Sequence, residues 1–224
     1  MSFTVAIDGP SGAGKSTCAR AAAKRLGMIY ADTGAIYRSI AYRCISDGVD
    51  VRDADAVGAH LSSITPELRF IGDEQRVYVN GEDVSGKIRT PEISMAASAV
   101  SAHPCARAFL LDLQRDIAVK NDVIMDGRDI GTVVLPDATI KIFLTASPEK
   151  RADRRCKELE DKGTPQPYDE VLADIIKRDY DDSHRKTAPL RQAEDAVLLD
   201  TGDMTLEESI EAVCRLAGEA RPKA

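Results

Sequence analysis

Residues 3–24 read Phe-Thr-Val-Ala-Ile-Asp-Gly-Pro-Ser-Gly-Ala-Gly-Lys-Ser-Thr-Cys-Ala-Arg-Ala-Ala-Ala-Lys, and this stretch decides the fold. Its apolar start predicts a strand and its alanine-rich end a helix, with a glycine loop between them. The loop Gly9–Ser16 has the spacing Gly-x4-Gly-Lys-Ser, which leaves backbone N–H groups free to bind phosphate oxygens at a helix N-terminus. Lys15 would reach the terminal phosphates and Ser16 a magnesium ion. A plain glycine turn needs no Lys-Ser pair, so the stretch predicts a nucleoside triphosphate site made of Gly9, Pro10, Ser11, Gly12, Ala13, Gly14, Lys15, Ser16 and Thr17.

Length and composition indicate a globular protein of one main domain, residues 1–224. With 43% hydrophobic residues, the chain can form one substantial core. The formal net charge of −7 argues against general nucleic-acid binding, which needs a broad basic surface. The five cysteines are far apart and show no metal-ligand or disulfide pattern. We find no signal peptide and no apolar run of membrane-spanning length, so we expect a cytoplasmic protein without membrane partners.

Strand and helix patterns alternate along the rest of the chain. Further strands are expected at residues 28–30, 123–126, 139–144 and 196–200, with helices between them. This alternation predicts an α/β fold with a parallel sheet. From Thr65 the hydrophobic pattern changes to the alternation of two strands, followed by an Asn80-Gly81 turn. This pattern predicts a small antiparallel insert at residues 66–87.

Capping patterns mark the starts of three later helices. Thr90 precedes Pro91, Ser147 precedes Pro148, and Thr205 stands three residues before Glu208. A hydroxyl side chain before a proline or three residues before a glutamate is typical of a helix N-terminus.

A triphosphate loop alone does not identify the second substrate, and two segments after predicted strands supply candidates. Asp32–Arg38 places a hydroxyl, an aromatic ring and a guanidinium near a helix start, which suits a nucleotide, although an ordinary Asp-Thr helix cap explains part of the pattern equally well. Asp126–Thr132 follows a strand at the sheet edge where ligand-binding loops gather. There Asp126 would support magnesium and Arg128 would neutralise phosphate, whereas the alternative is a glycine turn with a surface Arg-Asp pair.

Two helical segments carry further charged side chains. Arg178, Asp182 and Arg185 are spaced four and three residues apart, which predicts one shared helix face. On residues alone, a stabilising ion pair is the simpler explanation of this ridge. The other set is Arg151, Arg154 and Arg155, whose charge Glu158 would balance if they were only a solvated face.

These motifs together resemble the cytidylate kinase family, the P-loop nucleoside monophosphate kinases that phosphorylate CMP and dCMP. The P-loop is shared widely, whereas Gly34–Arg38 and Asp126–Asp129 are specific to this family. The hairpin insert is similar to that of the bacterial, insert-bearing form. The resemblance rests on residues 8–16, 32–38, 81–84, 88–90, 126–132, 178–179 and 188–190.

The resemblance implies both architecture and reaction. The fold would be a three-layer P-loop NTPase fold with a central parallel five-stranded sheet. A helical acceptor-binding part would span residues 33–65, a β-rich insert residues 66–90 and a short lid residues 150–168. The reaction would be direct in-line transfer of the γ-phosphoryl group of ATP to CMP or dCMP with Mg²⁺, giving ADP and CDP or dCDP.

The resemblance also implies roles for individual residues. Cytosine would be bound by Thr33, Ser98, Arg107 and Asp129, with Arg107 and Asp129 reading its exocyclic amine and ring carbonyl. The ribose would be held by Arg178 and Asp182. The acceptor phosphate would be bound by Tyr37, Arg38, Arg128 and Arg185. The catalytic groups would be Lys15, Arg128, Arg151 and Arg155, and Ser16 would bind Mg²⁺ with Asp126 behind it.

Two other functional classes remain open from the sequence. The first strand and loop alone would also permit another small-molecule P-loop kinase, acting on UMP, shikimate or a coenzyme precursor. A nucleotide switch should carry an Asn-Lys-x-Asp segment, and Asn121-Asp122 is no such motif. Thr33 stands where many relatives have serine, which keeps the hydroxyl but leaves fine substrate preference open. We expect a monomer whose partners are small nucleotides.

Overall fold

Five strands form a sheet in the order β2-β6-β1-β7-β8. The computed structural model describes residues 2–72 and 74–221. The strands are β1 Thr4–Asp8, β2 Ile29–Asp32, β6 Val123–Gly127, β7 Ile140–Thr145 and β8 Val197–Asp200. β7 pairs in parallel with β1 and with β8, so that Ile7 lies beside Ile142 and Leu144 beside Leu199. The predicted α/β fold with a parallel five-stranded sheet is therefore confirmed.

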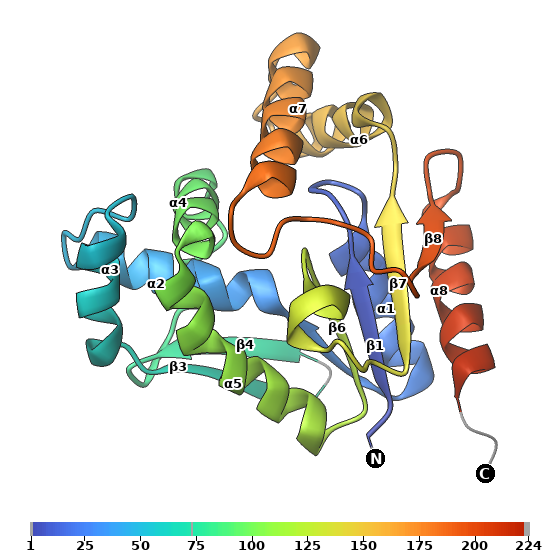
Figure 1. The fold of residues 1–224 in the computed structure, drawn as a ribbon. Coiled ribbons are helices and arrows are strands. Elements are labelled where there is room, and N and C mark those ends of the chain that lie inside the picture. The colour runs from blue at the N-terminus through green and yellow to red at the C-terminus, as the bar shows by residue number, and fades with distance from the viewer. Residues whose placement is uncertain (1, 73, 222–224) are drawn as a thin grey trace. The chain divides into compact units, whose positions relative to one another are not determined.

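One compact unit consists of residues 3–28 and 124–221. It contains strands β1, β7 and β8 and all of β6 except Val123. Its helices are α1 Lys15–Leu26, α6 Pro148–Asp161, α7 Tyr168–His184 and α8 Leu206–Ala220. Val5, Ala6 and Ile7 of β1 are fully buried, as their apolar run predicts. Helices α1 and α8 pack against each other (Figure 1).

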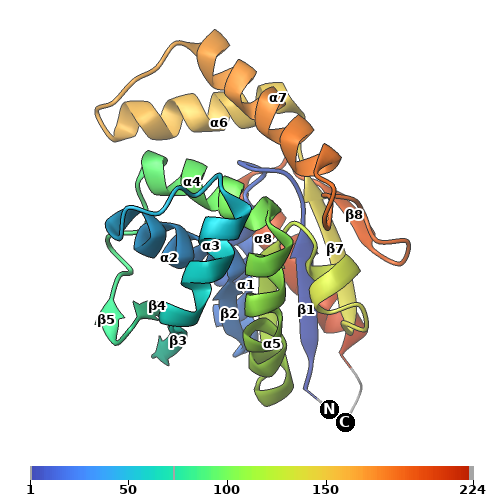
Figure 2. The same cartoon turned by 60° about the vertical axis from the view of Figure 1, so that its left-hand side comes forward.

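Helices α6 and α7 form a hairpin within this unit. Figure 2 shows them joined by the segment 162–167. The two helices share a small apolar core made of Ala152, Leu159, Val171 and Ile175. The segment predicted as a lid, residues 150–168, thus covers most of α6 and the connection, and α7 packs on it as a second helix.

The other unit contains residues 29–123. Its elements besides β2 are α2 Thr33–Ser46, α3 Ala54–His60, the 3₁₀ turn Leu61–Ser63, β3 Pro66–Ile71, β4 Glu74–Val79, β5 Glu82–Asp83, α4 Pro91–Ala102 and α5 Pro104–Lys120. Strands β3, β4 and β5 form a separate antiparallel sheet, which confirms the predicted β-rich segment. Val77 and Val79 of β4 are buried in one core with Ile36 and Ile40 of α2.

The predicted helix caps are present. Thr90 accepts a hydrogen bond from the N–H of Ile93, and Ser147 accepts one from the N–H of Lys150. Thr205 and Glu208 form a reciprocal capping box at the start of α8. Short polar side chains at these positions satisfy N–H groups that the first helical turn leaves without partners.

The structure differs from the sequence prediction in two places. Residues Ile130–Val134 form a single π-type turn, whereas we expected a ligand-binding loop or a glycine turn over Asp126–Thr132. In addition, α7 ends at His184, so the prediction that Arg185 shares a helix face with Arg178 and Asp182 is wrong. The chain turns away because the N–H of Leu190 bonds to the carbonyl of Asp182, with Ala188 in the left-handed region at φ 47.

Candidate active site

The phosphate loop follows β1 and leads into α1. Gly9, at φ 149, must be a glycine, because a Cβ at this position would lie 1.9 Å from the carbonyl oxygen of Leu144. Gly14 caps α1 in the left-handed region at φ 94. The first N–H groups of a helix have no helical partner and lie at its positive end. The loop therefore offers the predicted anion-binding backbone.

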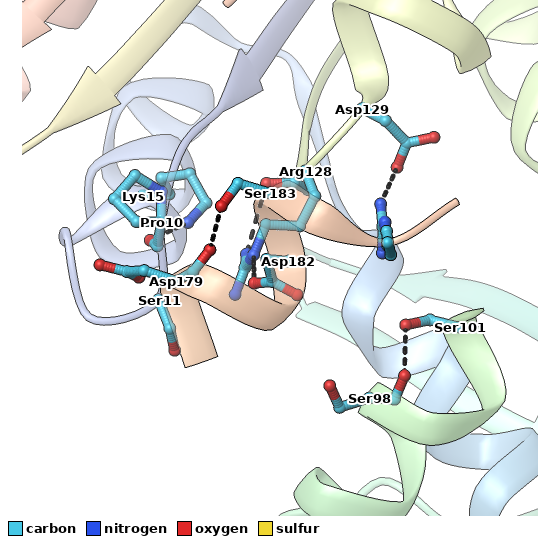
Figure 3. A network of polar contacts seen from close by, with 12 residues as sticks. Pro10, Ser11, Lys15, Ser98, Ser101, Arg128, Asp129, Asp179, Asp182 and Ser183 are labelled. Atoms are coloured by element: carbon cyan, nitrogen blue, oxygen red, sulfur yellow. Dashed lines mark hydrogen bonds and ion pairs between the residues drawn. The ribbon is translucent and has the colours of Figure 1, made fainter. Parts of the chain in front are cut away.

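Lys15 is buried beside this loop, and its Nζ donates a hydrogen bond to the carbonyl oxygen of Pro10 at 2.7 Å (Figure 3). Burial lowers the pKa of Lys15 to about 7, with a further lowering by Arg128, while Asp126 and Asp8 oppose the shift. A phosphate near Nζ would favour the charged ammonium form. A bound anion would thus stabilise the charged form of Lys15.

Ser16 and Asp126, the two residues predicted to support Mg²⁺, contact each other. The Ser16 hydroxyl donates to Oδ2 of Asp126 at 2.8 Å, and Asp126 is buried. Within the described part of the chain, no three His, Cys, Asp or Glu side chains are grouped to hold a metal ion. A hydroxyl backed by one carboxylate still fits Mg²⁺, which prefers oxygen ligands and takes most of them from phosphates and water.

Asp8 links the phosphate loop to the Asp126–Thr132 segment. Its two carboxylate oxygens accept hydrogen bonds from the N–H groups of Ile130 and Gly131, each at 2.7 Å. Burial raises the pKa of Asp8 to about 6, against the lowering effect of these two bonds. A Cβ at Gly131 would lie close to the Lys141 side chain, 3.0 Å from its Cδ, and 3.4 Å from Oδ2 of Asp8.

The residues that follow Asp126 pair with the end of α7. Nε of Arg128 donates to Oδ2 of Asp182 at 2.7 Å (Figure 3). Burial would raise the pKa of Asp182, but Arg128, aided by Arg178 and Arg185, outweighs it and lowers the pKa. A guanidinium nitrogen of Arg185 lies 3.4 Å from Oδ1 of Asp129, and its Nε bonds to the carbonyl oxygen of Ala188. Arg128 thus contacts the buried carboxylate of Asp182, and Arg178 and Arg185 contribute to lowering its pKa.

The three arginines of α6 have different surroundings. Arg151 is buried and bonds to the carbonyl oxygens of Ala146 and Ser11 and to both carboxylate oxygens of Asp179. Arg154 bonds to the carbonyl oxygens of Ala13 and Thr201. Arg155 is half-exposed and bonds to Glu158, which is the charge balance that the sequence left open. Arg151 and Arg154 thus touch the backbone of the phosphate loop.

The predicted residues of the other unit gather around α2 and α4. Thr33 and Tyr37 are buried on α2, and the guanidinium of Arg107 lies 5.7 Å from the centre of the Tyr37 ring. Arg107 also donates to the carbonyl oxygen of Ser101. The carbonyl oxygen of Ser98 accepts from the Ser101 hydroxyl (Figure 3).

Arg38 completes this set. It pairs with Asp32 at 2.7 Å, and the same carboxylate caps α2 through the N–H of Ala35. The Asp-Thr helix cap that competed with a nucleotide role is therefore present, and it also holds Arg38.

Sequence reasoning assigned no individual role to several residues that organise the site, namely Asp8, Gln75, Asp179 and Thr201. Asp8 had a signal, because a carboxylate that ends a buried strand directly before a glycine loop needs partners. Asp179 lies in the family motif at residues 178–179, but nothing local could name the partners of Asp179 and Thr201, which lie 28 and 47 residues away in the chain.

A model of the cytidylate kinase family matches residues 5–219. The chain belongs to the cytidylate kinase family. It is 46% identical over 220 residues to the cytidylate kinase of Exiguobacterium sp., covering 98% of each chain. It is 50% identical over 213 residues to the cytidylate kinase of Caldanaerobacter subterraneus subsp. tengcongensis, covering 95% of this chain and 93% of that one.

Solved structures place this member of the cytidylate kinase family among P-loop kinase folds. A gluconokinase from Sinorhizobium meliloti superposes with a TM-score of 0.50 at 14% identity, over 97% of this chain and 92% of that one. At this identity the similarity concerns the fold alone. Among residues 2–72 and 74–221, no helix combines the length and apolar character needed to cross a membrane.

Proposed function

We propose that this protein transfers the γ-phosphoryl group of ATP to CMP or dCMP, forming ADP and CDP or dCDP. The observation that carries the proposal is the phosphate loop with buried Lys15 and the Ser16–Asp126 hydrogen bond, in a chain that matches the cytidylate kinase family over residues 5–219. No covalent intermediate is needed, because in-line transfer depends on positioning and on neutralising charge.

ATP would bind through Gly9–Thr17, with Lys15 accompanying the transferred phosphoryl group. Arg151 supports this role because it already contacts the loop at Ser11. Arg155 would reach the same phosphates only after leaving Glu158. Cationic groups that bind more tightly as charge develops lower the barrier to transfer.

The residues proposed for acceptor binding are those that the family resemblance implies. In residues 29–123 we propose Thr33, Ser98 and Arg107 for the base and Tyr37 and Arg38 for the phosphate. In the other unit we propose Asp129 for the base, Arg178 and Asp182 for the ribose, and Arg128 and Arg185 for the phosphate. A base read by buried polar groups rejects wrong bases, because those would leave the groups unpaired.

Mg²⁺ is the proposed cofactor, and the Ser16 hydroxyl with Asp126 behind it would hold it. The ion would neutralise charge on the triphosphate oxygens. Asp126 fixes the Ser16 hydroxyl in the present hydrogen bond, which orients its lone pairs. We further propose that the protein acts as a cytoplasmic monomer on small nucleotides, and that residues 1–224 form one kinase domain with the parts named above.

An assay of ADP release with ATP and Mg²⁺ tests the proposed function. The acceptor panel would contain CMP, dCMP, UMP, AMP and shikimate at equal concentrations. We expect CMP and dCMP to give the largest kcat/KM values. A larger value for UMP, AMP or shikimate would overturn the proposal, and Lys15→Met should abolish the rate with every acceptor.

A further inference from the structure

Gln75 on strand β4 of the antiparallel insert bonds to both backbone groups of one residue outside the insert. Its Oε1 accepts from the N–H of Asp32 at 2.7 Å, and its Nε2 lies 3.4 Å from the carbonyl oxygen of Asp32. A side-chain amide carries both a donor and an acceptor. It therefore exchanges hydrogen bonds with Asp32 as a residue of a neighbouring strand would.

Asp32 stands at the junction of β2 and α2, where its side chain contacts Ala35, Arg38 and, as an ion pair at 3.9 Å, Arg89. Oδ1 accepts from the N–H of Ala35 at 2.9 Å and so caps α2. Oδ2 accepts from Arg38 at 2.7 Å, and the Asp32 side chain is only 8% exposed. Because the carboxylate is attached to the backbone that Gln75 holds, moving that backbone would move Arg38.

Arg38 depends on this carboxylate for its orientation. Gly34 leaves it space, since a Cβ at Gly34 would lie 3.1 Å from a guanidinium nitrogen of Arg38 and 3.2 Å from Asp32. Nε of Arg38 is buried and, among the described residues, has no hydrogen-bond partner. A buried donor without a partner is costly, which favours an anionic ligand at this guanidinium.

We propose that Gln75 is a positioning residue for the acceptor phosphate, acting through Asp32 on Arg38. This gives the β3–β5 insert a role in the reaction. The inference rests on the proposed function, because it assumes that Arg38 binds the phosphate of CMP. Attachment of the insert does not need Gln75, since Val77 and Val79 already pack in one core with α2.

The test is the variant Gln75→Met, which keeps the length of the side chain and removes both hydrogen bonds. We expect KM for CMP to rise about three- to tenfold, the effect of losing one or two neutral hydrogen bonds, with KM for ATP changed less than about twofold. The Kd for CMP from calorimetry should rise by the same factor. Equal losses of CMP and ATP affinity would show a merely structural role and overturn the inference.

A double-mutant cycle tests the route through Arg38. In the Arg38→Met background, Gln75→Met should have no further effect on KM for CMP, because the group that Gln75 positions is gone. If the two substitutions instead raised KM for CMP by factors that multiply, Gln75 would not act through Arg38. An Arg38→Met variant with an unchanged KM for CMP would also overturn this part of the inference. If the wild-type protein did not phosphorylate CMP at all, the proposed function itself would have failed.

Two further variants serve as control and reserve. Arg69→Met removes another polar side chain of the insert, whose partners Glu67 and Tyr78 both belong to the insert, and it should behave as wild type.

Gln75→Glu keeps the acceptor for the N–H of Asp32. It should give a KM for CMP between those of wild type and Gln75→Met, and it preserves the test if the methionine variant folds poorly. A wild-type KM for Gln75→Met would also overturn the inference.

Discussion

At the scale of single residues, Asp8 connects the phosphate loop Gly9–Ser16 to the Asp126–Thr132 segment of the same unit. It directly precedes Gly9 in the chain, and its carboxylate holds the turn that follows Arg128 and Asp129. In Asp8→Asn the new NH₂ group would face one of two N–H donors and leave it without a partner. We expect a loss of about 1–3 kcal/mol in the free energy of unfolding and a kcat/KM for CMP at least about tenfold lower. Thermal melting and initial rates measure both.

Asp137→Asn is the matched control for Asp8→Asn. Asp137 is exposed and undergoes the same chemical change, so its melting temperature and kinetics should stay at wild-type values. Wild-type stability and rates in Asp8→Asn as well would contradict the role of Asp8 as the link between the two segments.

At the scale of elements, the α6–α7 hairpin presents its arginines unequally. Arg151 is buried against Ser11 and Asp179, whereas the Arg155 side chain is 41% exposed beside Glu158. We expect Arg151→Met to lower kcat about 100-fold or more, as for loss of a preorganised charge at the transferring group, and Arg155→Met to lower it about tenfold or less. Steady-state rates at saturating ATP and CMP decide the order.

Lys157→Met on the exposed face of α6 is the control for the hairpin variants and should keep the wild-type kcat. A larger loss in Arg155→Met than in Arg151→Met would reverse the assigned order. Melting curves show whether Arg151→Met also loosens the hairpin, since its partner Asp179 would then be left without its guanidinium.

The elements also show what the sequence could predict. The strand–loop–helix of residues 3–24 and the caps at Thr90, Ser147 and Thr205 follow from local chemistry, and the structure has them. The π-type turn at Ile130–Val134 follows instead from Asp8, more than 120 residues earlier in the chain. The position of Arg185 depends on Leu190 reaching back to Asp182. Such contacts over long chain separations leave no local pattern. The sequence could therefore suggest Glu158 as a partner for Arg155, three residues away, but not Asp179 for Arg151 or Thr201 for Arg154.

At the scale of the whole molecule, burial of Lys15 makes stability depend on pH. The pKa of Lys15 is about 7 in the folded protein, against an ordinary value of 10.5. Below pH 7, Lys15 is charged in both the folded and the unfolded state, and the folded state bears the full cost of burying that charge. Between about pH 7 and 10.5 the unfolded state binds more protons, so stability rises with pH through this group. The Lys15→Met variant has no charge to bury at this position, so at pH 6 its melting temperature should be higher than that of the wild type.

The difference in the free energy of unfolding between Lys15→Met and wild type should then narrow by on the order of 2 kcal/mol between pH 6 and pH 9. The reason is that pH 9 lies two pH units above the pKa of Lys15 in the folded state. Denaturant unfolding at the two pH values measures this difference directly. Lys177→Met, at a side chain 75% exposed, should show no such pH dependence. A constant or widening difference would mean that Lys15 keeps an ordinary pKa in the free protein. In that case Pro10 and the neighbouring carboxylates would fully compensate its burial, and an arriving triphosphate would find the lysine already charged.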